Sequence, residues 1–85
     1  MKQFLVLAIR RPEFDEAVIA PHRAFLDDLR AAGRLELAGG FADRTGGAYL
    51  LRGIETLDEA RRLVATDPLV TARASDLTVF EWNAG

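Results

Sequence analysis

The sequence predicts a small α+β domain whose elements follow the order strand, helix, strand, strand, helix, strand. Short runs of branched and aromatic residues indicate the strands, and two stretches with apolar residues three and four positions apart indicate the helices. Glycine and proline separate these segments. A chain of 85 residues fits one domain, taken as residues 1–85. Such a domain buries only about two-thirds of the surface of its unfolded chain, so association is a natural further source of stability.

The first strand is predicted at residues 3–9, because the run QFLVLAI is followed by a break at Arg10-Arg11-Pro12. Alternation divides its apolar side chains between two faces, with Phe4, Val6 and Ala8 on one and Leu5, Leu7 and Ile9 on the other. Neither face of this strand therefore suits water.

The first helix is predicted from about Ala20, after a loose turn at residues 13–18, because Pro21 is acceptable in a first helical turn. Its apolar stripe continues to Ala32. Gly33 can adopt the left-handed conformation that ends a helix.

The second and third strands are predicted at residues 34–41 and 48–53, with a turn over residues 43–47 that includes Gly46-Gly47. In the second strand, Leu35 and Leu37 alternate with polar residues and are expected to share a face.

Thr56 and Glu59 form a capping-box pattern, which predicts a second helix ending near Thr66. Residues 77–82 form the fourth predicted strand, with Leu77 and Val79 on one face and Phe80 and Trp82 on the other. The order βαββαβ, with a central hairpin, gives the ferredoxin-like arrangement around a four-stranded antiparallel sheet.

Two helices cover one face of such a sheet and leave the other bare, although the first and last strands are apolar on both faces. Soluble monomers seldom expose more than a few hundred Å² of contiguous apolar surface. We therefore expect a homodimer in which two sheets meet face to face around a barrel-like interior. An edge strand could pair again and give a higher oligomer.

Composition excludes several classes of protein. The net charge is −2 and both signs are interspersed, so no nucleic-acid partner is expected. Cysteine is absent, which excludes disulfides and thiolate sites. No motif for a metal or cofactor is present, and none is expected. The apolar run after Lys2 is too short for a membrane span and lacks a signal-peptide layout, so the expected location is cytoplasmic, without membrane association.

His22 is the single histidine, and it lies on the apolar stripe in the first turn of the predicted helix. The positive end of the helix dipole favours the neutral imidazole by roughly 0.3–1 kcal/mol, which suits a base. The alternative is a core or interface histidine satisfied by a hydrogen bond.

Asp67 precedes Pro68, which disfavours a helical conformation at the aspartate and ends the second helix there. An aspartate N-cap followed by proline at the first position begins a short helical turn over Leu69 to Ala72. The functional alternative is a carboxylate that orients His22.

Other candidates for binding are a glycine pair and three aromatic residues. Gly39-Gly40 allows a close backbone approach to a ligand, or is a plain strand end. Tyr49, Phe80 and Trp82 lie on strands, where they either line a cleft at the open face or pack in a dimer.

Several of these segments together resemble the YCII-related domain family. The similarity runs in order along essentially the whole chain, through Pro21-His22-Arg23-Ala24-Phe25-Leu26, Leu29, Ala32-Gly33-Arg34-Leu35, Ala38-Gly39-Gly40 and Ala65-Thr66-Asp67-Pro68-Leu69. Two positions depart from the family pattern: Gly40 stands where proline is frequent, and Leu69 where an aromatic residue is frequent.

The resemblance implies a ferredoxin-like fold, a dimeric α/β barrel and a catalytic pair formed by His22 and Asp67. The wider superfamily includes muconolactone isomerase-like enzymes, so it implies an isomerase or lyase that transfers a proton on a small cyclic oxygenated substrate. Arg23, Gly39, Gly40, Tyr49, Phe80 and Trp82 are the expected substrate-binding residues. The alternative function is a non-catalytic dimer that binds a small molecule or a protein.

Overall fold

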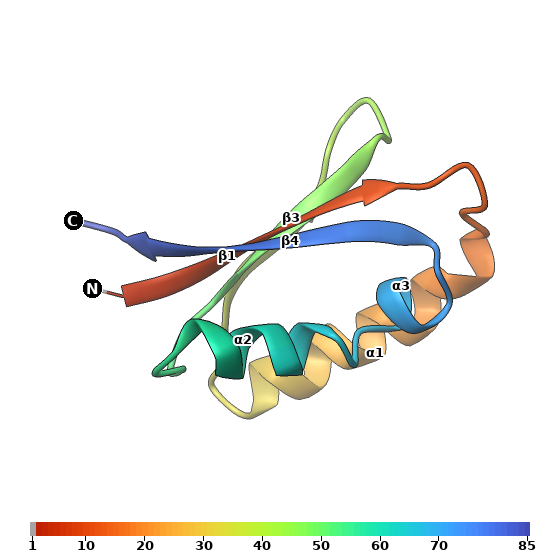
Figure 1. Ribbon diagram of the computed structural model, residues 1–85. Helices are drawn as coiled ribbons and strands as arrows, with labels where there is room; N and C mark the ends of the chain where they lie inside the picture. Colours follow the sequence, from red (N-terminus) through yellow and green to blue (C-terminus); the bar gives the residue numbers. More distant parts are fainter. Residues whose placement is uncertain (1) are drawn as a thin grey trace.

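The computed structural model describes residues 2–85 as one antiparallel sheet with helices on one of its faces (Figure 1). The elements are β1 (Lys2–Arg10), a 3-10 turn η1 (Glu16–Val18), α1 (Ile19–Ala31), β2 (Leu35–Gly40), β3 (Gly46–Leu51), α2 (Leu57–Val64), α3 (Pro68–Thr71) and β4 (Ser75–Asn83). The strand order is β2-β3-β1-β4, as the ferredoxin-like arrangement requires.

The helix ends follow from local chemistry. Gly33 has a φ of 73°, so it takes the left-handed conformation just beyond α1. The Thr56 side chain accepts a hydrogen bond from the Glu59 N–H and caps α2. Both predictions are confirmed.

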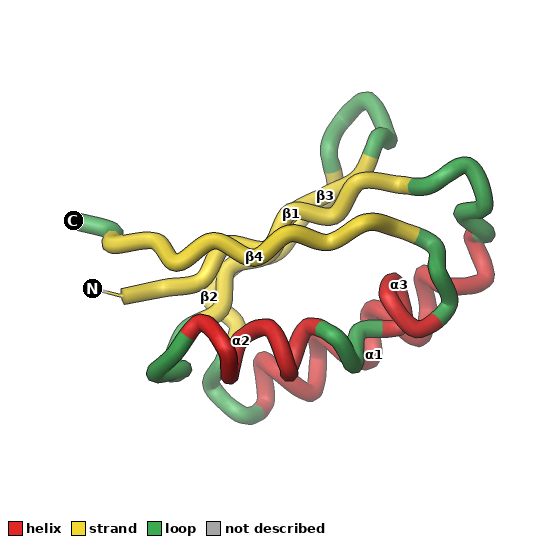
Figure 2. The backbone as a smooth tube through the Cα atoms, in the orientation of Figure 1, coloured by secondary structure: helices red, strands yellow, loops and turns green. Residues whose placement is uncertain are grey.

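The two faces of β1 have different surroundings. Phe4, Val6 and Ala8 are buried in the core beneath the helices, as the alternation predicts. Leu5 and Leu7 face the other way and are partly exposed, and Ile9 is 46 % exposed. Figure 2 shows the same division: all three helices lie on one side of the sheet, and no element of the described chain covers the other.

A bulge corrects the prediction for β2. Leu35 pairs with Leu51 and Leu37 pairs with Leu50, so two steps along β2 correspond to one step along β3. The extra residue turns Leu37 to the open face, where it is 69 % exposed, while Leu35 stays in the core. The expectation that the two leucines share a face is therefore wrong.

The prediction that Gly46 and Gly47 form the hairpin turn is also wrong, because both lie in β3. Glycine is required at both positions because the neighbouring strand backbone is close. A Cβ atom at Gly46 would lie 1.9 Å from the carbonyl oxygen of Ala8, and a Cβ atom at Gly47 would lie 2.5 Å from the carbonyl oxygen of Gly39. The turn itself comes earlier, at residues 41–45.

Candidate functional site

Asp67 lies at the break between α2 and α3 and is fully buried. Its backbone is extended, with φ −61° and ψ 131°, as the following proline favours. Its Oδ1 accepts a hydrogen bond of 2.8 Å from the Leu69 N–H, and Pro68 occupies the first position of α3. The predicted N-cap is therefore present, and it fixes the direction of the carboxylate.

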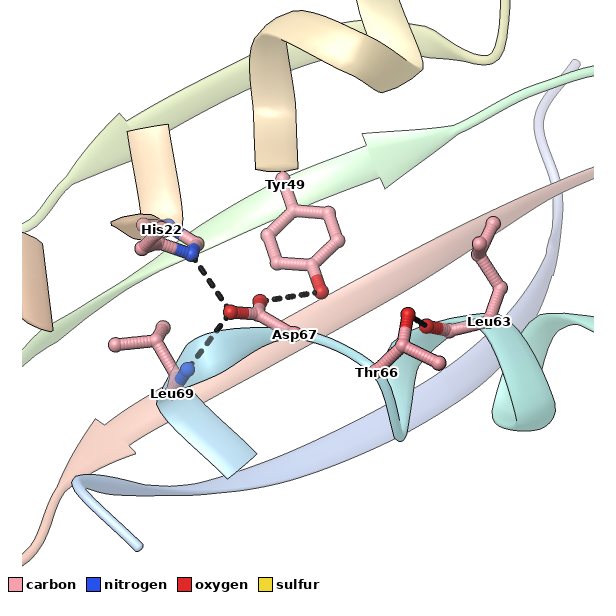
Figure 3. Close-up of polar contacts among 6 residues, drawn as sticks. All are labelled: His22, Tyr49, Leu63, Thr66, Asp67 and Leu69. Carbon is pink, nitrogen blue, oxygen red and sulfur yellow. Dashed lines mark hydrogen bonds and ion pairs between the residues drawn. The ribbon is translucent and has the colours of Figure 1, made fainter. Parts of the chain in front are cut away.

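His22 approaches the same carboxylate from the first turn of α1. Its Nδ1 lies 2.9 Å from Oδ1 of Asp67, although the two residues are 45 positions apart in the chain (Figure 3). The His22 side chain is 19 % exposed, so the ring is mostly buried but remains open to one side. Asp67 thus both caps α3 and contacts His22, and the two interpretations of its sequence position are compatible.

Tyr49, in the middle of β3, holds the other oxygen of Asp67. Its hydroxyl donates a hydrogen bond of 2.9 Å to Oδ2 (Figure 3). Burial, the charge of Asp67 and this hydrogen bond raise the pKa of Tyr49 well above its ordinary value of 10.0. Tyr49 is therefore a donor to the carboxylate at any ordinary pH, and its ring centroid lies 6.0 Å from that of His22.

These contacts fix the tautomer of the imidazole. An ionised carboxylate offers only acceptors, and Oδ1 of Asp67 faces Nδ1 of His22. The proton of the neutral imidazole therefore lies on Nδ1, which donates to Asp67. Nε2 then carries the free lone pair, the form in which a histidine acts as a base.

His22 lines a cavity of about 370 Å³ between α1 and the sheet, at the end where β2 and β3 join. Small residues leave this space open. Ala8, Gly47 and Gly40 are paired across three neighbouring strands, so they form one row on the helix-covered face. A row without bulky side chains cannot fill the gap to α1, and the imidazole forms part of its wall.

The sequence of residues 2–83 matches the YCII-related domain. The chain belongs to this family. The uncharacterized protein YjpA of Bacillus subtilis (strain 168) is 42 % identical to this YCII-related domain over 83 residues, which cover 98 % of the present chain and 96 % of YjpA.

Two solved structures resemble the YCII-related domain described here. The first is 5-chloro-2-hydroxyhydroquinone dehydrochlorinase (TftG) from Burkholderia phenoliruptrix AC1100, in complex with 2,5-dihydroxybenzoquinone. Its TM-score is 0.77 at 27 % identity, and the match covers 98 % of this chain and 95 % of that one. The second, an antibiotic biosynthesis monooxygenase, has a TM-score of 0.64 at 18 % identity, with 100 % and 99 % of the chains covered, and shares the fold.

Four of the expected substrate-binding residues of this YCII-related domain line the His22 cavity: Arg23, Gly39, Gly40 and Tyr49. Phe80 and Trp82 do not. They pair across from Leu5 and Gln3 on the open face of the sheet, and each is 47 % exposed. The two residues therefore lie on the open face, as expected, and away from His22, whose cavity lies between α1 and the opposite face. The expectation that Tyr49 shares the open face is wrong, because Tyr49 pairs with Val6 and is buried beneath the helices.

Sequence reasoning missed three polar residues of the cavity wall: Arg10, Arg30 and Ser75. Arg10 continues the alternation of Phe4, Val6 and Ala8, and this signal would have placed it on the helix-covered face. Ser75 was missed because the predicted fourth strand begins at Leu77, two residues after the observed start of β4.

Among residues 2–85, no group of three or more histidine, aspartate or glutamate side chains is placed to hold a metal ion. Within the same described part of the chain, no helix is long and apolar enough to cross a membrane.

Proposed function

We propose that this protein is an enzyme that transfers a proton on a small cyclic oxygenated substrate, as an isomerase or as a lyase of the elimination type. His22 is the general base and acid, and Asp67 positions its ring. The observation that carries the proposal is the hydrogen bond between Nδ1 of His22 and the buried carboxylate of Asp67, at the wall of a cavity.

The geometry suits proton transfer because each part of the pair has a defined task. Asp67 fixes the imidazole and, as an adjacent negative charge, stabilises the imidazolium that forms when Nε2 accepts a proton. Tyr49 and the Leu69 N–H hold the carboxylate, so the pair needs little reorganisation during the reaction.

Two balanced outcomes can follow proton removal from a ring. In an isomerisation, His22 returns the proton to another atom of the same substrate. In an elimination, the electron pair left behind expels a leaving group, which departs as an anion with its bonding electrons. The similarity to a dehydrochlorinase at 27 % identity supports the second outcome, with chloride as one leaving group to test.

The test is turnover with 5-chloro-2-hydroxyhydroquinone, followed by chloride release, together with deuterium uptake from heavy water into hydroxylated rings. We expect chloride release or deuterium uptake with the wild-type chain, and a loss of about 10²–10⁴-fold in His22→Gln. Circular dichroism establishes that the variant is folded. If neither reaction occurs while small rings still bind, the non-catalytic binding module replaces this proposal.

We also propose that the protein is a homodimer joined through the open face of the sheet. Large apolar side chains are exposed on that face: Ile9, Leu37, Phe80 and Trp82 are between 46 % and 69 % exposed. Leu5 and Leu7 lie between Ile9, Phe80 and Trp82 in the strand register and are partly exposed, so the apolar surface extends across β1 and β4. A second copy offers the same surface and a symmetric way to bury it.

A further inference from the structure

Positive charge lines the cavity that contains His22. Arg10 of β1 and Arg23 and Arg30 of α1 contribute to its wall, and among residues 2–85 no aspartate or glutamate does so. Arg30 forms an ion pair of 2.8 Å with Asp27. Neither Arg10 nor Arg23 forms an ion pair with any other residue that the structure describes. The wall therefore presents two guanidinium groups whose charge the described chain does not neutralise.

Arg10 is held in place by an aromatic ring. Its guanidinium carbon lies 4.1 Å from the centroid of the Phe14 ring, a cation–π arrangement that restricts the side chain without using its N–H donors. A guanidinium with free donors in a fixed plane suits a planar anionic group such as a carboxylate.

Ser75 lies beside Arg10 and has an unused hydroxyl. The two residues are partners in the register of β1 and β4, and both line the cavity. Ser75 as a whole residue is 6 % exposed, and its hydroxyl makes no hydrogen bond to any of residues 2–85. Its oxygen is not sealed from solvent, so it is open to the cavity that Ser75 lines. A serine hydroxyl at a cavity wall that is free of protein partners can donate a hydrogen bond to an anionic oxygen of a ligand.

We propose that Arg10 and Ser75 bind an anionic oxygen of the substrate, which is therefore a small ring carrying a carboxylate or an ionised hydroxyl group. This inference rests on the proposed function in that it places the anion in the cavity where His22 acts. The volume of about 370 Å³ lies near the lower end of the usual range for ligand pockets, about 300–1,000 Å³, and so suits a single ring.

A matched pair of ligands tests the charge requirement. 2,5-Dihydroxybenzoate and its neutral amide, 2,5-dihydroxybenzamide, have the same ring and hydroxyl groups and differ by one negative charge. Calorimetric titration of the wild-type protein should show the acid binding about tenfold or more tightly than the amide. Failure of the acid to bind, or equal affinity for the two compounds, overturns the proposal.

Three variants locate the preference. Arg10→Met should weaken binding of the acid by about tenfold and leave the amide nearly unchanged. Arg62→Gln makes the same charge change on the exposed side of α2 and should have no effect on either ligand. If Arg10→Met keeps the preference for the acid, or Arg62→Gln loses it equally, Arg10 does not bind the anion.

Ser75→Ala separates binding from folding. Because the hydroxyl has no partner among residues 2–85, its removal should leave the melting temperature unchanged or raise it, while the acid binds several-fold more weakly. A lower melting temperature with unchanged binding would instead give the hydroxyl a structural role. These binding measurements are independent of turnover. If the protein prefers the acid but shows neither chloride release nor deuterium uptake, the anion site stands and the proposed reaction is rejected. If turnover occurs without a preference for the acid, the proposed reaction stands and the anion site is rejected.

Discussion

The hydroxyl of Tyr49 donates a hydrogen bond of 2.9 Å to Oδ2 of Asp67, on the side of the carboxylate away from the 2.9 Å contact with His22. Three elements of the fold therefore meet at one buried side chain: β3 supplies the phenol, α1 the imidazole and α3 the capped N–H. The carboxylate that positions the candidate base also joins the sheet to the helices. Stability and activity should consequently respond together to changes at this point, but in different proportions.

Tyr49→Phe should lower the free energy of unfolding by about 1–3 kcal/mol, because it leaves Oδ2 of a fully buried carboxylate without its donor. Urea denaturation of the two proteins measures the difference. Thr66→Val is a useful control, since it also removes a hydroxyl bond, to the Leu63 carbonyl, but at an exposed position. The control should change stability by no more than about 0.5 kcal/mol. An equal effect of both variants would contradict a special role for Tyr49.

Alkaline pH should destabilise the wild-type protein more than Tyr49→Phe. Burial and Asp67 raise the pKa of Tyr49 in the folded chain above 10.0, whereas the unfolded chain ionises near that value. The corresponding stabilisation is fully present below about pH 10 and is lost progressively at higher pH, because only the unfolded state then releases the proton. Urea midpoints between about pH 8 and about pH 11 measure this difference.

The phenolate absorbance gives an independent measurement, since Tyr49 is the single tyrosine. In the folded protein its absorbance should rise only together with unfolding. Ionisation near pH 10 in a protein that remains folded would contradict the buried hydrogen bond.

Asp67→Asn and Asp67→Ala should separate orientation from folding. Asparagine is as good an N-cap as aspartate, so the bond from the Leu69 N–H survives, but the negative charge beside His22 is lost. We expect turnover to fall by about 10²–10⁴-fold in the asparagine variant. Alanine leaves both Leu69 N–H and Tyr49 O–H without an acceptor, at a cost of about 1–3 kcal/mol each. Comparable melting temperatures for the two variants would contradict this division.

Most of the fold follows from local sequence patterns. Thr56 and Gly33 mark helix ends by their own chemistry, and Asp67-Pro68 specifies both a break and a cap. Local patterns do not specify the register, that is, which residues of two neighbouring strands are paired. The bulge that turns Leu37 outward depends on how β2 pairs with β3, and alternation along β2 alone cannot indicate it.

The candidate site can be predicted only in part, because local sequence patterns do not contain the packing of one element against another. His22 and Asp67 were identified from helix-end chemistry and family resemblance, but their contact depends on how α1 packs against α3. Alternation correctly separates Phe80 and Trp82 from Leu77 and Val79, yet it does not say which face the helices cover. The expectation that Tyr49 shares the open face with Phe80 and Trp82 is therefore wrong, because Tyr49 pairs with Val6 and is buried beneath the helices.

Phe80→Glu should convert the proposed dimer to a monomer, because it places a charge in the middle of the exposed apolar face. Sedimentation measures the change in mass. The single tryptophan, Trp82, lies on the same face, and its fluorescence should shift to longer wavelength as the interface opens. Thr71→Glu adds the same charge at an exposed position of α3 and should leave the dimer intact. A wild-type protein that sediments as a monomer would reject the dimer.

Gly40→Val should abolish ligand binding without unfolding the protein. Gly40 lies in the row with Gly47 and Ala8 on the cavity side, and a Cβ there would have only the Gly46 carbonyl oxygen within contact, at 3.9 Å. The added side chain would therefore occupy the cavity rather than collide with the backbone.

Gly39→Val is the matched control for this variant. The Gly39 residue lines the cavity only with its backbone, because Gly39 pairs with Ala48 and an added side chain would point to the open face, with nothing within 4 Å. Calorimetry with 2,5-dihydroxybenzoate should show binding lost in the first variant and kept in the second, at similar melting temperatures. If Gly40→Val binds the acid as the wild type does, the ligand does not occupy the cavity between α1 and the sheet, and the assignment of the site to His22, Arg10 and Ser75 is wrong.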